Sequence, residues 1–131
     1  MDMRILCYGD SNTYGCIGRW SDSEPTGGRY DADHRWPAVM GKALGEGYHV
    51  IEGGFNGRST IYDDPSAYGR NGETTLVHSL AENAPLDLVC ILLGTNDLVR
   101  NKTITEDDLP TGILRLIGII RQHPEYGREG V

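Results

Sequence analysis

The feature that most constrains the fold is an almost unbroken apolar run at residues 86–93, LDLVCILL, which Gly94 ends. Runs of this kind are typical of parallel strands that helices cover on both faces. Shorter apolar runs at residues 4–8 and 48–52 predict two further strands, and each of them also leads into glycine. We therefore expect a parallel sheet whose third strand is covered on both faces.

Segments with helical spacing alternate with these strands. Residues 36–44 place Pro37 in a first turn, and residues 71–82 form a second candidate helix. A third helix begins after Asp108, which we expect to cap it, and ends at residues 123–124. The inward residues of the second helix are Leu76, Val77 and Leu80, and the third helix carries Ile113, Leu114, Leu116, Ile117 and Ile120.

The alternation of three strands with three helices predicts an α/β fold, a flavodoxin-like three-layer α/β/α sandwich with right-handed crossovers. Residues 17–35 are rich in Gly, Ser and Asp and predict a long loop. The 131 residues fit a single domain, but three strands make a small sheet of this kind. We therefore expect residues 1–131 to be the N-terminal part of one domain, with its C-terminal strands missing.

The composition limits partners and location. With 12 basic and 19 acidic side chains, the net charge of −7 disfavours nucleic acids and anionic membranes. The apolar run at the N-terminus is too short for a signal peptide and no stretch reaches the length of a membrane span, so we expect a cytoplasmic location. Cys7 and Cys90 lie in apolar runs and are typical small hydrophobes, whereas Cys16 lies near a polar cluster.

Three polar clusters follow the predicted strands: GDSNTYG at residues 9–15, GGFNGRS at 53–59 and GTND at 94–97. Ligands of open parallel sheets bind outside the carboxyl ends of the strands, so we expect these clusters to lie together. Ser11, between glycines that permit a tight turn, can present its hydroxyl there, while N–H groups and an asparagine amide can stabilise an oxyanion. These parts suit acyl transfer, although Ser11 taken alone is more typical of an ordinary turn.

The clusters are similar to the sequence blocks of the GDSL/SGNH hydrolases. GDSNTYG resembles the first block, GTND resembles the third, and Gly57 stands where the second block has its oxyanion residue. The surrounding sequences RILCYGDSNTYG, RWPAVM, VIEGGFNGRST and DLVCILLGTND resemble the arylesterase and acyltransferase branch. The resemblance implies a serine esterase or acyltransferase that acts on small esters, with water or an alcohol as acceptor, and that needs no cofactor and no metal.

The resemblance also assigns roles to single residues. Ser11 is the expected nucleophile of an acyl-serine mechanism. The backbone N–H groups of Ser11 and Gly57 and the side chain of Asn96 are the expected oxyanion hole. In this family the first aspartate of these blocks orders its turn and the last supports the asparagine. The supporting residues are therefore Gly9, Asp10, Gly94 and Asp97.

Four further residues near these clusters are candidates for lining the substrate, and each also has a plainer interpretation. The candidates are Asn12, Tyr14, Trp20 and Arg58. Asn12 equally suits a position that shapes the turn. The two aromatic residues equally suit partly buried loop positions, and Arg58 is more typical of an exposed loop arginine.

The general base is not assigned by the resemblance. The family carries an Asp-x-x-His block near its C-terminus, and this sequence ends before it, so the catalytic Asp and His are absent. The same spacing occurs at Asp31 and His34, inside the expected loop, and we interpret it as coincidental. His49, His78 and His123 are more typical of surface or packing positions.

Because a serine hydroxyl without a base is a weak nucleophile, we expect very low activity from these 131 residues alone. The alternative to an active hydrolase is a truncated or split domain that has no turnover on its own. Such a domain is either a folded remnant or needs a complementing C-terminal fragment. The third strand would then be an unprotected sheet edge, which favours such a fragment or a homo-oligomer.

A different class of function rests on two aspartates. Asp10 and Asp97 follow two of the predicted strands and are the type of residue that binds Mg²⁺ in phosphotransfer sites. Such a site favours additional carboxylates and a lysine at a strand end, and neither Lys42 nor Lys102 is so placed. A dinucleotide site is disfavoured further, because no G-x-G-x-x-G follows the first strand.

Overall fold

A three-stranded parallel sheet lies at the centre of the computed structural model, which describes residues 2–18 and 28–128. The strand order is β2–β1–β3, so the chain crosses over β1 between its second and third strands. β1 occupies the middle because its residues from Ile5 onwards are all buried. The three strands are β1 (Met3–Gly9), β2 (Tyr48–Gly54) and β3 (Leu88–Leu92), which confirms the predicted set.

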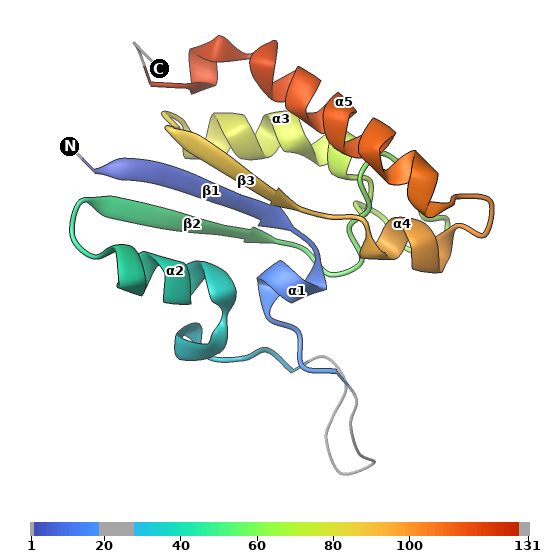
Figure 1. The fold of residues 1–131 in the computed structure, drawn as a ribbon, viewed down its shortest axis with the longest axis horizontal. Helices are drawn as coiled ribbons and strands as arrows, with labels where there is room; N and C mark the ends of the chain where they lie inside the picture. The colour runs from blue at the N-terminus through green and yellow to red at the C-terminus, as the bar shows by residue number, and fades with distance from the viewer. Residues whose placement is uncertain (1, 19–27, 129–131) are drawn as a thin grey trace.

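Helices lie on both faces of the sheet (Figure 1), as the three-layer prediction requires. α2 (Trp36–Leu44) packs along β2 on one face, and α3 (Gly72–Asn83) and α5 (Leu109–Arg121) lie together on the other. The local sequence explains where two of these helices begin. Pro37 lies in the first turn of α2, and the side chain of Asn71 caps α3 by accepting from the N–H of Glu73 at 3.0 Å.

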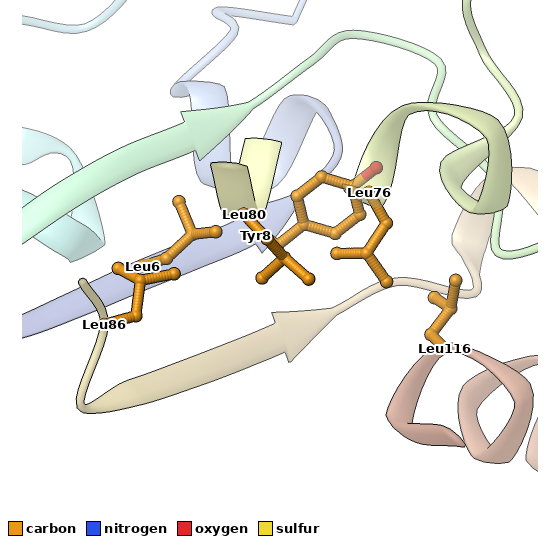
Figure 2. Close-up of a cluster of buried hydrophobic side chains, with 6 residues drawn as sticks. All are labelled: Leu6, Tyr8, Leu76, Leu80, Leu86 and Leu116. Atoms are coloured by element: carbon orange, nitrogen blue, oxygen red, sulfur yellow. The ribbon is translucent and has the colours of Figure 1, made fainter. Parts of the chain in front are cut away.

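The main core forms between the sheet and the pair α3 and α5 (Figure 2). The buried phenol of Tyr8 donates to the carbonyl of Gly72 at 2.6 Å, so its polar end is satisfied at no cost to the packing. The cluster consists of Leu6, Tyr8, Leu76, Leu80, Leu86 and Leu116. Predicted inward positions of the second and third helices therefore supply half of this core.

Cys7 packs like a small apolar side chain. It is fully buried in β1, and its register partner in β3 is Cys90. Burial and the neighbouring Cys90 raise the pKa of the Cys7 thiol to about 12, so this thiol stays protonated at neutral pH.

The prediction that the third strand is covered on both faces is wrong for the described residues. Val89 and Ile91 pack against the core, whereas Leu88 and Leu92 are 50% and 49% exposed. The reason is that α2 covers the sheet at β2, two strands away from β3 (Figure 1). β3 is thus an edge strand with one apolar face open.

Several short elements replace stretches that the sequence predicts as connections. They are α1 (Ser11–Tyr14), α4 (Thr95–Arg100) and the 3-10 turns Ala32–His34, Glu106–Asp108 and Pro124–Tyr126. Asp108 does not cap α5 through its side chain as expected, because its carboxylate accepts from the N–H of Thr105 at 2.8 Å and closes the preceding turn. Of the predicted loop at 17–35, residues 19–27 lie outside the described part.

Candidate active site

The carboxyl ends of the three strands meet at one edge of the sheet. The register pairs Gly9 of β1 with Gly54 of β2 and with Leu92 of β3. Immediately beyond them, the N–H of Phe55 donates to the carbonyl of Gly9 at 3.1 Å. The three polar clusters therefore start side by side, as predicted, and α1 and α4 both lie at this edge (Figure 1).

Ser11 is the first residue of α1 and is half-buried. Asp10 caps the helix, and its carboxylate accepts from the N–H of Asn12 at 2.9 Å. Gly9 permits this sharp strand-to-helix turn, since a Cβ at that position would collide with the side chain of Thr13. The turn places Ser11 just beyond the carboxyl end of β1.

Gly57 and Asn96 come from the second and third clusters. Gly57 has a φ of 81°, in the left-handed region that favours glycine, and a Cβ there would collide with the side chain of Arg70. Asn96 is the second residue of α4, and its side-chain amide donates to the carbonyl of Arg58 at 3.1 Å. The bond brings the Asn96 amide to the residue next to Gly57.

Asp97 anchors α4 to the loop after β2. It is 1% exposed, and its carboxylate accepts from the N–H of Thr60 at 2.9 Å and from the Thr60 hydroxyl in a second, short hydrogen bond. Gly94, with a φ of 135°, makes the turn from β3 into this helix. Asp97 thus steadies the helix that carries Asn96 by holding a neighbouring loop.

The carboxyl of Asp10 lies in an unusual electrostatic environment. It is 1% exposed, and burial is the main reason that its pKa is raised above the ordinary value for aspartate. The hydrogen bond from Asn12 opposes this shift, and the negative charge of Asp97 adds to it. Two buried carboxyl groups therefore lie in the first and third clusters, and each accepts a hydrogen bond from a backbone N–H group.

Arg58 is not the exposed loop residue that its sequence context favours. It is 7% exposed, and its guanidinium carbon lies 4.0 Å from the centre of the Tyr8 ring. Nη1 donates to the carbonyl of Gly53 at 2.7 Å and to that of Gly9 at 3.2 Å. The side chain is therefore directed into the fold, against backbone rather than solvent. The sequence signal that was available is the glycine-rich run with Phe55 immediately before it.

The other substrate-lining candidates are placed differently. Asn12 is exposed beside Ser11, and Tyr14 is half-buried with the guanidinium carbon of Arg29 4.2 Å from the centre of its ring. Trp20 lies outside the described residues. The positions of Asn12 and Tyr14 on α1 keep both beside the nucleophile candidate, and their contact with substrate stays a prediction.

The Asp-x-x-His spacing of the loop does form a hydrogen-bonded pair. Asp31 Oδ1 lies 2.7 Å from His34 Nδ1, and both side chains are 69% exposed. The bond raises the pKa of His34 and lowers that of Asp31. Among the hydrogen bonds of residues 2–18 and 28–128, none joins His34 to Ser11. The pair has the internal geometry of an oriented imidazole, but within the described residues no hydrogen bond connects it to the nucleophile candidate.

The remaining histidines lie away from the site. The His123–Glu125 pair, 2.7 Å apart, follows α5 at the opposite edge of the sheet, where the N–H of Leu86 donates to the carbonyl of Tyr126 at 2.8 Å. A strand of seven residues is about 23 Å long, which is too far for direct proton transfer to Ser11. His49 is exposed near the start of β2, and His78 is an exposed residue of α3.

Two further observations concern the described residues only. They contain no group of three or more His, Cys, Asp or Glu side chains placed to hold a metal ion. None of their helices combines the length and the apolar character that crossing a membrane demands.

Solved structures of esterases share this fold and much of the sequence. A carbohydrate acetylesterase from Sinorhizobium meliloti, Est24, is 42% identical with a TM-score of 0.80, over 89% of this chain and 54% of its own. The inhibitor-bound aryl esterase of M. smegmatis is 40% identical with a TM-score of 0.81, over 88% of this chain and 53% of its own. The chain thus spans about half the length of these relatives. No curated protein sequence matches it.

A more distant structure, AlinE4, described as an SGNH-hydrolase family esterase, is 18% identical with a TM-score of 0.65 and shares the fold alone. The family model of the GDSL-like lipase/acylhydrolases matches residues 7–127, nearly the whole chain. The chain belongs to the GDSL-like lipase/acylhydrolase family.

Proposed function

We propose that this chain supplies the nucleophile and the oxyanion hole of a carboxylic ester hydrolase or acyltransferase. The observation that carries the proposal is the meeting of Ser11, Gly57 and Asn96 at one edge of the sheet, through the register of Gly9 with its neighbours and the bond from Asn96 to the carbonyl of Arg58. Family membership adds the expectation that the serine of this block is the reactive one.

In this proposal the Ser11 oxygen attacks the ester carbonyl while its proton passes to a base. The tetrahedral intermediate collapses to an acyl-serine as the base returns the proton to the departing alcohol, and water or an acceptor alcohol then takes the acyl group and releases Ser11. The backbone N–H groups of Ser11 and Gly57 stabilise the developing oxyanion together with the Asn96 amide. That amide has two N–H donors, and one of them is held by the carbonyl of Arg58. The second donor is left for the oxyanion, with its direction already set.

The substrate proposal rests on the similar proteins. One of them is called a carbohydrate acetylesterase and another an aryl esterase, so both names denote ester cleavage and the first names acetyl as the acyl group. We propose a short-chain ester as substrate and water or an alcohol as acceptor. A cytoplasmic location stays a prediction from the sequence.

The base is proposed to come from a complementing segment. β3 is an edge strand in the described part, with Leu88 and Leu92 half exposed. Beside it lies an apolar groove of about 430 Å³, lined by residues that include Val89, Ile117 and Tyr126. The chain spans about half of the length of its solved relatives. We therefore propose that a C-terminal fragment pairs with the open side of strand β3 and carries the Asp-x-x-His.

A complementation assay tests both parts. The purified chain would be mixed with the part of the S. meliloti acetylesterase that lies beyond the matched region, hereafter the complementing fragment, and assayed with p-nitrophenyl acetate. We expect turnover that neither piece shows alone and that Ser11→Ala abolishes. Ser79→Ala, a serine of α3, is the matched control and should retain turnover. Turnover that survives Ser11→Ala contradicts the nucleophile assignment, and a mixture without Ser11-dependent turnover contradicts the complementation.

A further inference from the structure

One side chain contacts the backbone of two of the three clusters at once. Arg58 Nη1 donates to the carbonyl of Gly53 at 2.7 Å and to that of Gly9 at 3.2 Å. Gly9 is two residues before Ser11, and Gly53 lies at the end of β2. The guanidinium therefore ties the turn that presents the serine to the strand that leads into the Gly57 turn.

The backbone of Arg58 completes the connection. Its N–H donates to the carbonyl of Phe55 at 3.1 Å and closes the turn that contains Gly57, whose φ is 81°. Its carbonyl accepts from the Asn96 side-chain amide at 3.1 Å. Thus the same residue shapes the turn of one proposed oxyanion donor and orients another.

The burial of Arg58 is costly, which argues that its position is not incidental. Arginine is rarely buried to 7% exposure without full pairing. Its Nε is buried and has no hydrogen-bond acceptor among the residues that the structure describes. The rings of Tyr8 and Phe55, with centres 4.0 and 5.4 Å from the guanidinium carbon, and the nearby Asp10 offset part of the cost.

We propose that Arg58 is a positioning residue that aligns Ser11, Gly57 and Asn96 by fixing the backbone around all three. The proposal rests on the proposed function for its catalytic meaning, but the alignment itself is a property of the 131-residue chain. It uses the guanidinium as a whole, because Nη1 donates to both carbonyls while the guanidinium group lies over the Tyr8 ring. A lysine at this place meets only part of the requirement.

Arg4 provides a matched control for a purely structural arginine. Its guanidinium also donates to two backbone carbonyls, those of Pro85 and Asn83, both at 2.9 Å, but it does so at the opposite edge of the sheet. Replacing either arginine by methionine keeps the length of the apolar stem and removes the donors. Loss of stability alone is therefore common to Arg58→Met and Arg4→Met, and loss of alignment is specific to Arg58→Met.

The first measurement follows the Asn96 side-chain amide by NMR in the chain without any fragment. We expect its bonded proton to be protected from exchange with water in the wild type and in Arg4→Met. In Arg58→Met the protection falls roughly tenfold, the size expected for loss of one hydrogen bond. Arg58→Lys is intermediate and serves if Arg58→Met does not fold. Equal protection in the wild type and both Arg58 variants overturns the proposal.

The second measurement separates kcat from KM in the chain mixed with the complementing fragment. Arg58→Met should lower kcat by about tenfold or more, with KM changed less than about threefold, because the oxyanion donors act mainly in the transition state. Arg58→Lys should recover part of the loss and Arg4→Met should show none at temperatures where it is folded. Equal losses in Arg58→Met and Arg4→Met overturn the proposal. Turnover retained by Ser11→Ala refutes the proposed function and leaves the NMR result to decide the alignment.

Discussion

The two edges of the sheet use the same residue types in opposite ways. At the amino ends of the strands, Asp87 lies between Arg128, 2.7 Å away, and the N–H of Arg4. At the carboxyl ends, Asp10 is buried and its carboxyl is held by the N–H of Asn12. The pKa of Asp87 is consequently lowered, chiefly by Arg128, whereas burial raises that of Asp10.

The amino-end edge thus has a structural role, whereas the carboxyl-end edge is the candidate active site. The amino-end edge is an ion-paired seam that joins the two ends of the described chain to β3, because Arg128 also donates to the carbonyl of Asp2 at 2.7 Å. The carboxyl-end edge instead gathers two buried aspartates, which accept hydrogen bonds from backbone N–H groups, beside one serine. Groups of that kind cost stability, and proteins retain them where function needs them.

The largest expected effect is the loss of turnover when the nucleophile candidate at the carboxyl-end edge is removed. Ser11→Ala in the chain mixed with the complementing fragment should lower turnover of p-nitrophenyl acetate by about a thousandfold or more, because no other group forms the acyl intermediate. The measurement is the steady-state rate, with folding checked by circular dichroism. A loss below tenfold would show that the edge is not the catalytic one.

The next effect is on stability. Asp97→Ala should lower the free energy of unfolding by about 2–3 kcal/mol, because the N–H and hydroxyl of Thr60 lose their common acceptor in a buried place. Urea denaturation of the chain measures it. The exposed Asp107 is the matched control, and Asp107→Ala should change the free energy of unfolding by less than about 0.5 kcal/mol. Similar values for the two variants would contradict the anchoring role of Asp97.

The contributions of Asp10 and Asp87 to the free energy of unfolding should change with pH in opposite directions. A raised pKa in the folded state means that protonated Asp10 is favoured by folding, so its contribution is present below the unfolded pKa of about 3.9 and is lost as pH rises through the folded pKa. The lowered pKa of Asp87 gives stability that is present above about 3.9 and is lost as pH falls through the folded pKa.

Denaturation of the wild type, Asp10→Asn and Asp87→Asn between pH 3 and 7 tests this contrast. The advantage of the wild type over Asp87→Asn should grow with pH, and its advantage over Asp10→Asn should shrink. Parallel curves for both variants would show that the two carboxyl groups do not differ in environment.

The smallest effect is expected from His123 at the amino-end edge. Its side chain pairs with Glu125 and its ring stacks on Tyr126 at a centre-to-centre distance of 5.6 Å, remote from Ser11. Because His123 lines the groove proposed for the complementing fragment, the test uses a saturating concentration of that fragment. Under that condition His123→Ala should leave kcat unchanged and alter the free energy of unfolding by less than about 0.5 kcal/mol. A large loss of turnover in this variant would mean that the edges cooperate in catalysis.

The sequence predicts those parts of the fold that depend on local pattern. Apolar runs and helical spacing locate the strands and the three long helices, and the order of the elements is sufficient to bring Ser11, Gly57 and Asn96 to one edge. Short helices escape prediction because four to six residues show no period. The open face of β3 could not be predicted either. An apolar run indicates that a strand will be covered, but it does not show which part of the chain covers it.

The contacts between the site residues are less predictable from the sequence than the identity of those residues. The position of Arg58 depends on packing over Tyr8, 50 residues earlier, and on carbonyls whose direction only the fold determines. Likewise the bonds between Asp97 and Thr60 connect two clusters that the sequence treats as separate. Long-range polar contacts of this kind carry no local sequence pattern.

The most direct test of the central claim locates the reactive serine. The chain mixed with the complementing fragment would be treated with a fluorophosphonate, which modifies activated serines, and digested for peptide mass spectrometry. We expect an adduct on Ser11 and none on this chain in the Ser11→Ala variant. An adduct on a different residue of the chain, or labelling that persists in Ser11→Ala, would contradict the assignment of Ser11 as the nucleophile.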